Sequence, residues 1–288
     1  MRTHLAHGAD AWRGEELHPS GKRNFQKVQS SMLVWPSGRN ALFCSWGWAF
    51  ILLLAVSSSG LMVDAATSDS SPPLTASCLK FLALGDWGTS KVESTAKSMA
   101  RYVGTEGREL LGCNATVSSV LLLGDNFYDN GITSTDDPLV HEYFEKNFAT
   151  PAFENTSFSV IVGNHDHRGS VRSQVELTDT DATHRWYLPR PFYSQTFEVN
   201  KLRVLFVFID TWDLVGGEAE VNGKDQRIKD EQQMRWIKDV LRTEDVDFKV
   251  VVGHYPIRSA RRGTPGLIKD LLPVLLENNV DAYVFGYV

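Results

Sequence analysis

Four short motifs combine glycine with side chains that can bind a metal ion: GDWG, GDNFY, GNHDH and GHYP. They offer carboxylate, carboxamide, phenol and imidazole groups but no thiolate, a donor set that suits iron, zinc or manganese. An aspartate shared between two such ions would hold them about 3.5–4 Å apart, and this arrangement activates water and clamps a phosphoryl group. The candidate residues are Asp86, Asp125, Asn126, Tyr128, Asn164, His165, Asp166, His167 and His254.

Each motif also has a simpler explanation when it is taken alone. An Asp after Gly at a strand end is more often a turn residue than a ligand, and a single His there is usually a hydrogen-bonded structural residue. Recurrence favours a shared site, because four such motifs follow successive apolar runs of one chain.

The elements that must position these residues are visible as short apolar runs, such as KFLAL, SVLLL, FSVIV and KVVV. Runs that are continuous rather than alternating predict strands buried on both faces, in sheets covered by helices. Helical patterns occupy residues 90–103 and 230–244, the latter with Trp236 as a packing residue. Ligands of open α/β sheets bind beyond the carboxyl ends of the strands. The sequence therefore predicts that the motif side chains meet at one edge.

The motif order GDxG, GDN, GNHD and GH resembles that of the metallophosphoesterases. The forms GDWG, GDNFYDNG, GNHDH and GHYP are similar to those of the purple acid phosphatases, in particular their small, tartrate-resistant branch. The resemblance runs from about Phe81 to Gly286. Tyr128 is its most specific residue, because the corresponding motif of the protein Ser/Thr phosphatases has no phenol there. The resemblance implies a metallophosphoesterase fold of the α/β class, a sandwich of two mixed β-sheets flanked by helices (αββα).

A dinuclear metal centre is also implied by the resemblance. Asp86 and Tyr128 would bind Fe3+, and Asp125 would bridge the two ions. Asn164 and His254 would bind a second divalent metal, which could be Fe2+, Zn2+ or Mn2+.

The activity implied is that of an acid phosphatase, which hydrolyses phosphate monoesters with a hydroxide that the two metals activate. Asn164 and His165 would contact the substrate, and His165, as the catalytic residue, would either position the phosphate or protonate the leaving alkoxide. His167 could assist, or could equally be a surface residue. The expected partners are small phosphomonoester substrates or phosphoproteins, and we expect a monomer.

In the family pattern a His-x-His motif follows Gly286, whereas this chain has Tyr287 and Val288. We therefore expect the catalytic domain, residues 78–288, to be C-terminally incomplete and this chain to be weakly active or inactive. One alternative is a catalytically dead member that binds phosphate ligands or a protein partner. Another is a metallophosphoesterase that acts on nucleotides or diesters, which Tyr128 disfavours.

Residues 1–65 are expected to be an N-terminal extension with a signal peptide or signal anchor. The uncharged stretch ALFCSWGWAFILLLAVSSSGLMV follows a basic segment, and Val63 and Ala65 fit the small-residue rule for signal cleavage. If the stretch is retained it would contact the membrane, since about 20 apolar residues span a bilayer. Residues 66–77 form a linker rich in Ser and Pro. We therefore expect the secretory pathway, with the protein secreted, vacuolar or lysosomal.

Composition and modification sites fit that interpretation. Asn114 in NAT and Asn155 in NTS are candidate glycosylation sites. Cys78 and Cys113 could form a disulfide or remain free thiols. Residues 1–40 carry six Lys or Arg against three acids and residues 41–63 carry no charge, so the remainder has a net charge of −9 within the overall −6. An acidic domain argues against nucleic acid as the main partner.

Overall fold

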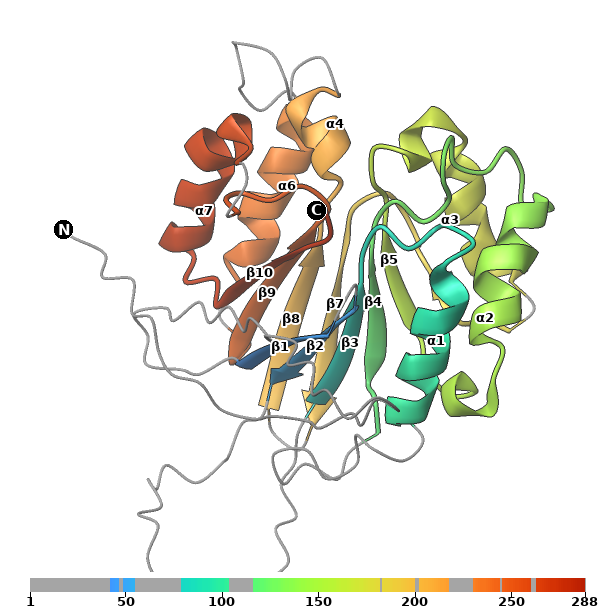
Figure 1. The fold of residues 1–288 in the computed structure, drawn as a ribbon. Helices are drawn as coiled ribbons and strands as arrows, with labels where there is room; N and C mark the ends of the chain where they lie inside the picture. The colour runs from blue at the N-terminus through green and yellow to red at the C-terminus, as the bar shows by residue number, and fades with distance from the viewer. Residues whose placement is uncertain are drawn as a thin grey trace, which may run out of the picture.

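Two β-sheets pack face to face in the computed structural model, and helices cover the outer face of each sheet (Figure 1). The structure describes residues 42–46, 49–54, 79–103, 116–181, 183–199, 202–217, 230–243, 245–259 and 263–287. The predicted αββα sandwich is confirmed.

The first sheet has the strand order β1-β2-β3-β4-β5-β6. Strands β3 to β6 are parallel, and every residue of β3, β4 and β5 is buried, as their continuous apolar runs predicted. The strands are β1 (Leu42–Trp46), β2 (Ala49–Leu54), β3 (Leu79–Leu84), β4 (Ser119–Leu123), β5 (Phe158–Ile161) and β6 (Trp186–Tyr187).

The second sheet has the order β10-β9-β8-β7. Strands β8, β9 and β10 are parallel, and β7 runs antiparallel to β8. The strands are β7 (Tyr193–Val199), β8 (Leu202–Phe208), β9 (Phe248–Gly253) and β10 (Ala282–Phe285).

Aromatic rings fill the layer between the sheets. The ring of Phe81 on β3 lies 4.6 Å from that of Phe206 on β8 and 4.9 Å from that of Phe197 on β7. The first sheet is covered by helices in the segments 92–101, 140–148 and 171–180, and the second by helices in 211–215, 231–241 and 267–277 (Figure 1). These are α1 (Val92–Arg101), η3 (Val140–Glu145), α2 (Lys146–Phe148), α3 (Val171–Thr180), α4 (Thr211–Val215), α6 (Glu231–Leu241), η6 (Leu267–Leu271) and α7 (Leu272–Glu277), with short η4 (Pro151–Phe153) and η5 (Asp166–Arg168).

Helix α6 shows how the sequence pattern sets this packing. Asp230 caps its first turn by accepting a hydrogen bond from the Gln233 N–H at 2.9 Å. Met234, Ile237 and Leu241 are buried against the second sheet. Trp236 packs on the Phe192 ring at 5.0 Å, which confirms the packing role predicted for it.

The apolar stretch expected to be a signal contributes two strands. β1 and β2 form an antiparallel pair, and β2 pairs with the free edge of β3. None of the helices that the structure describes is long and apolar enough to cross a membrane. Residues 66–77 lie outside the described residues, as do Cys78 and Cys113. The signal peptide or anchor, the linker and the state of these thiols therefore stay predictions.

Candidate metal centre

The carboxyl ends of the parallel strands in both sheets meet at one edge, at the top of Figure 1. Asp86 follows β3 and Asp125 follows β4, both in the first sheet. Asn164 and His165 follow β5 of the same sheet, whereas His254 follows β9 of the second. The predicted metal and catalytic residues therefore come from four strand ends and from both sheets.

Three buried oxygen and nitrogen atoms converge on the inner side of this edge. The His254 Nε2 atom lies 3.2 Å from Asn164 Oδ1 and 3.5 Å from Asp125 Oδ1. Asp125, Asn164 and His254 are all buried. Asp86, Asp125 and His254 each offer a ligand atom within 4.8 Å of the other two.

The tautomer of His254 decides what this cluster attracts. Its Nδ1 lies 2.8 Å from the Leu123 carbonyl oxygen, which can only accept, so Nδ1 carries the proton. Burial lowers the pKa of His254, which favours the neutral ring. The lone pair of Nε2 therefore faces two acceptor oxygens. Three converging acceptors repel one another unless a cation lies between them, so the residues present fit a metal ion.

The two half-sites share Asp125. Its Oδ2 accepts a hydrogen bond from the Tyr128 hydroxyl at 2.8 Å, and its Oδ1 faces His254 and accepts from the His165 N–H at 2.9 Å. Each carboxylate oxygen thus belongs to a different side of the cluster, as a bridging ligand requires.

Tyr128 lies among negative charges. Burial, followed by the carboxylates of Asp125 and Asp86, raises the pKa of Tyr128 far above its usual range. A bound cation would reverse this effect, because it is the largest local charge and favours the phenolate. Metal binding at this half-site therefore has to displace the Tyr128 proton.

Local backbone conformation also marks the site. Asp86 and Asp125 have φ angles of +53° and +54°, in the left-handed region that non-glycine residues rarely adopt. Gly163 is required for another reason, since a Cβ there would lie 2.3 Å from Asp125 Oδ1. The motif glycine therefore lets the β5 loop approach Asp125.

His165 is half-buried beside the cluster. Its ring lies 4.3 Å from the Tyr128 ring, and its Nδ1 donates to the Asp129 carbonyl at 2.7 Å. Nε2 is then the ring nitrogen left for a substrate.

Two of the candidate ligands read from the motifs have a structural role instead. Asp166 is fully buried and accepts hydrogen bonds from the N–H groups of Asn126 and Gly163 and from the Gln174 amide. The Asn126 amide donates to the Ile161 carbonyl and to Gln174. Because the protein already satisfies these groups, Asn126 and Asp166 tie the β4 and β5 loops together rather than offering ligand atoms.

Sequence reasoning missed Asp210, which follows β8 at the same edge. It is fully buried, and its Oδ2 accepts a hydrogen bond from His167 Nε2 at 2.8 Å. His167, Asp210 and Asp213 form a second group of ligand-type atoms within 4.8 Å of one another. The run LRVLFVFIDT carried the signal, since Asp210 follows its apolar residues just as Asp, Asn or His follows those of the other site strands.

Other predicted sites lie away from this edge or outside the described residues. Asn155 is exposed in the turn before β5, and Asn114 lies outside the residues that the structure describes, so glycosylation of both stays a prediction.

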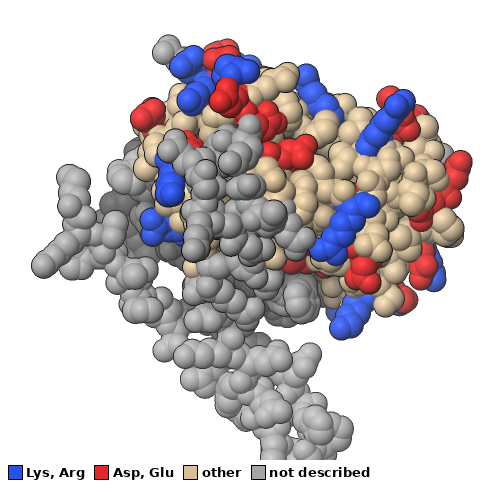
Figure 2. All heavy atoms as spheres, turned by 90° about the horizontal axis from the view of Figure 1, so that it is seen from above, with Lys and Arg blue, Asp and Glu red and all other residues tan. Residues whose placement is uncertain are grey.

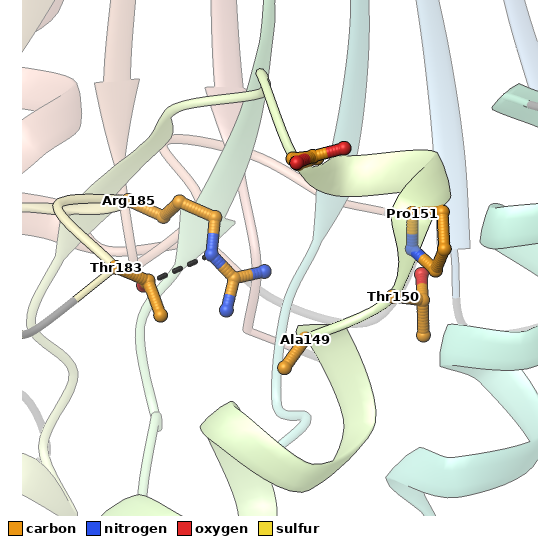
Figure 3. A pocket seen from close by; sticks show the side chains of 6 residues that line it. Ala149, Thr150, Pro151, Thr183 and Arg185 are labelled. Carbon is orange, nitrogen blue, oxygen red and sulfur yellow. Dashed lines mark hydrogen bonds between the residues drawn. The ribbon is translucent and has the colours of Figure 1, made fainter.

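A surface pocket near Thr150 and Arg185 lies at the amino ends of β5 and β6, opposite the cluster. In this pocket Arg185 Nε donates a hydrogen bond to Thr183 Oγ1 at 2.9 Å (Figure 3).

The face above the cluster carries both signs of charge. Figure 2 looks down on this edge, and on the part drawn in colour Lys and Arg side chains are interspersed with Asp and Glu. A continuous basic field of the kind that follows a nucleic-acid backbone is not visible on that part.

Comparison with known proteins identifies the family. The family model of the calcineurin-like phosphoesterases matches residues 79–286. Tartrate-resistant acid phosphatase type 5 of Sus scrofa is 32% identical over 259 residues, which are 83% of this chain and 72% of that protein. Purple acid phosphatase 17 of Arabidopsis thaliana is 30% identical over 282 residues, 93% of this chain and 74% of that protein.

A solved structure described as GAP50, the anchor in the inner membrane complex of Plasmodium, superposes with a TM-score of 0.58 and 27% identity. The match covers 72% of this chain and 65% of that one, so the chain spans less than two thirds of that protein. On these matches, and on the strand-end cluster of Asp, Asn and His, the chain belongs to the calcineurin-like phosphoesterase family and is similar to its purple acid phosphatases.

Proposed function

We propose that this protein is an acid phosphatase that hydrolyses phosphate monoesters with two metal ions at the strand-end cluster. The proposal rests mainly on the convergence of three buried acceptor atoms, His254 Nε2, Asn164 Oδ1 and Asp125 Oδ1. A cation bound between them would offset their mutual repulsion. The similarity to acid phosphatases over most of the chain supports the same activity.

The residues divide into two half-sites around Asp125. Asp86 and Tyr128 would hold one ion, and Asn164 and His254 would hold the other. Phenolate and carboxylate oxygens suit Fe3+, whereas amide and imidazole suit Fe2+, Zn2+ or Mn2+. When bound, such a metal pair activates water and neutralises charge on the phosphoryl oxygens.

His165 would supply the proton that the departing alkoxide needs. Its Nδ1 is held by the Asp129 carbonyl and its ring packs on Tyr128, so the ring orientation is fixed beside the cluster. A protonated Nε2 could then donate to the leaving oxygen, and Asn164 and His165 would contact the phosphate. The proposed substrates are small phosphomonoesters or phosphoproteins.

We propose a location in the secretory pathway, either secreted or in a vacuole or lysosome. The uncharged stretch of residues 41–63 and the exposed sequon at Asn155 support this location.

A non-catalytic role is the second candidate. The similar GAP50 structure is described as an anchor in a membrane complex, so a protein with a similar fold has a role other than catalysis in its description. In that case the chain would bind a phosphate ligand or a protein partner without turning it over.

Metal content and hydrolysis of p-nitrophenyl phosphate at pH 5 separate the two candidates. The wild-type chain should be measured beside Asp125→Asn as the metal-site variant and Asp179→Asn, an exposed change on α3, as the matched control. Two ions per chain and turnover that Asp125→Asn abolishes support the enzyme. Bound phosphate without turnover supports the binding protein, and activity that survives Asp125→Asn refutes the ligand assignment.

A further inference from the structure

We propose that His167 and the first turn of α4, Asp210–Thr211, form a clamp between the sheets that positions Asn164 and His254 as a ligand pair. The inference rests on the proposed function, because it concerns the second half-site. Asp210 and Thr211 were not among the predicted site residues, and His167 was expected either to assist or to be a surface residue.

The two ligands belong to different sheets, and the hydrogen bond from His254 Nδ1 to the Leu123 carbonyl orients the imidazole against the first sheet but does not hold Asn164. Asn164 follows β5 of the first sheet, and His254 follows β9 of the second. Hydrogen-bond ladders fix the spacing of strands within each sheet but not between sheets. Even so, the Asn164 Oδ1 and His254 Nε2 atoms lie 3.2 Å apart. A cation bound by both atoms would need this distance to be held within narrow limits.

His167 makes the first half of the clamp. It lies three residues beyond Asn164 on the same loop, and its Nε2 donates to Asp210 Oδ2 of the second sheet at 2.8 Å. Its ring also stacks on Trp212 of α4, with centroids 5.8 Å apart and planes 24° from parallel. The side chain is only 13% exposed, so this hydrogen bond is largely shielded from water.

Asp210 is a rigid partner for His167. Its Oδ1 accepts from the Trp212 and Asp213 N–H groups and so caps α4. The Gln233 side chain of α6 holds its backbone, accepting from the Asp210 N–H at 2.9 Å and donating to its carbonyl at 3.1 Å. Any movement of His167 is therefore resisted by two helices of the second sheet.

Thr211 makes the second half of the clamp. It is fully buried, and its Oγ1 accepts a hydrogen bond from the Tyr255 N–H at 3.0 Å. Tyr255 directly follows His254, so the same helical turn holds the backbone beside His254 and the His167 side chain three residues beyond Asn164. The geometry assigns to this turn the task of setting the distance between Asn164 and His254.

The clamp predicts a selective loss of one metal ion. In His167→Phe the aromatic ring can still stack on Trp212, but the N–H that binds Asp210 is lost. Affinity for one of the two ions should fall about 10- to 100-fold, the usual effect of removing a residue that orients a metal ligand. Tyr128 forms its hydrogen bond with Asp125, whereas His167 forms its own with Asp210, so the ion beside Tyr128 should bind within about twofold of the wild type.

The test is equilibrium dialysis of the full chain against Zn2+, with both dissociation constants and the melting temperature measured. His167→Gln, which restores an N–H donor, should regain most of the lost affinity. His141→Phe, a change at an exposed histidine paired with Glu145, is the matched control and should alter neither constant. If His167→Phe does not fold, Thr211→Val tests the other half of the clamp and should weaken the same ion.

The outcomes are distinct. Loss of one ion, with rescue by glutamine, supports the clamp. Unchanged binding with a lower melting temperature, or equal weakening of both ions, overturns it and leaves the proposed function intact. A wild-type chain that binds no metal refutes the proposed function, and the clamp with it, before any variant is measured.

Discussion

Replacing Gly163 with alanine should damage the metal site more than it damages the fold. An added Cβ would lie 2.3 Å from Asp125 Oδ1, 2.5 Å from the Asp125 nitrogen and 2.9 Å from the Cε1 atom of His254. Ordinary contacts of this kind are no shorter than about 3.4 Å, so Asp125 or the β5 loop has to move by about 1 Å. Overpacking of this kind costs about 1–3 kcal/mol of unfolding free energy.

A displacement of that size is large for metal binding. Ligand distances tolerate only about 0.2 Å, and a preorganised site about 0.5 Å. We therefore expect Gly163→Ala to weaken Zn2+ or Mn2+ binding at least about tenfold, measured by equilibrium dialysis, while urea denaturation of the metal-free chain reports the smaller cost to the fold.

Gly217→Ala provides the matched control. Gly217 has a φ of +88°, so alanine there is strained, but among the described residues the atoms nearest to its Cβ would be those of the Trp212 ring, at 3.6 Å, an ordinary contact distance. This variant should lose about 1–2 kcal/mol of unfolding free energy and keep wild-type metal affinity. If Gly163→Ala binds metal as tightly as Gly217→Ala does, the reasoning about the approach of the β5 loop to Asp125 is wrong.

Three further changes test other parts of the site and fold. His165→Ala should lower kcat about 10²–10⁴-fold with unchanged metal content; a change in metal content instead would make His165 a ligand. Tyr128→Phe should abolish any visible charge-transfer band of the iron-loaded protein, and a band that persists would exclude Tyr128 as the ligand. Burial alone would raise the pKa of Asp181, but hydrogen bonds from Trp186 and Thr183 lower that pKa below its usual value. Asp181→Asn should therefore lower the free energy of unfolding by about 1–3 kcal/mol at pH 7. The difference from the wild type should shrink as the pH falls through the lowered folded-state pKa, because wild-type Asp181 then also becomes neutral. Urea titrations at pH 7 and pH 3 measure this difference, and a difference that does not change with pH would show that the carboxylate contributes nothing.

The sequence was sufficient to predict that the candidate ligands converge at one edge, because this convergence depends only on where each residue stands relative to its strand. Asp86, Asp125, Asn164 and His254 each stand within three residues of a strand end, and parallel strands bring such ends to one edge. The continuous apolar runs likewise predicted strands buried on both faces. The resemblance to a known family then supplied the αββα arrangement.

What the sequence could not resolve depends on contacts between distant segments. Asn126 and Asp166 have the same side-chain chemistry as ligands, and only their hydrogen bonds to Ile161, Gly163 and Gln174 show that they are already satisfied. The sequence left His167 as either an assisting residue or a surface residue, because its partner Asp210 is 43 positions away. The pairing of β2 with β3 was hidden for a similar reason, since an apolar stretch of that length fits a signal, a membrane helix or a pair of strands equally well.

The placement of the cluster across the seam between the sheets connects its chemistry to the stability of the fold. The carboxylates of Asp86 and Asp125 come from the first sheet and the imidazole of His254 from the second, so a cation held among them would join the sheets at their open edge. Below that edge the sheets are held by non-directional aromatic contacts, such as Phe81 with Phe206, and by hydrogen bonds such as that from the Tyr193 hydroxyl to the Val160 carbonyl. At the site itself, the hydrogen bonds of His167 with Asp210 and of His254 with the Leu123 carbonyl cross between the sheets and add a directional restraint. The same few residues that set the ligand geometry therefore also limit how far the two sheets can slide at the site.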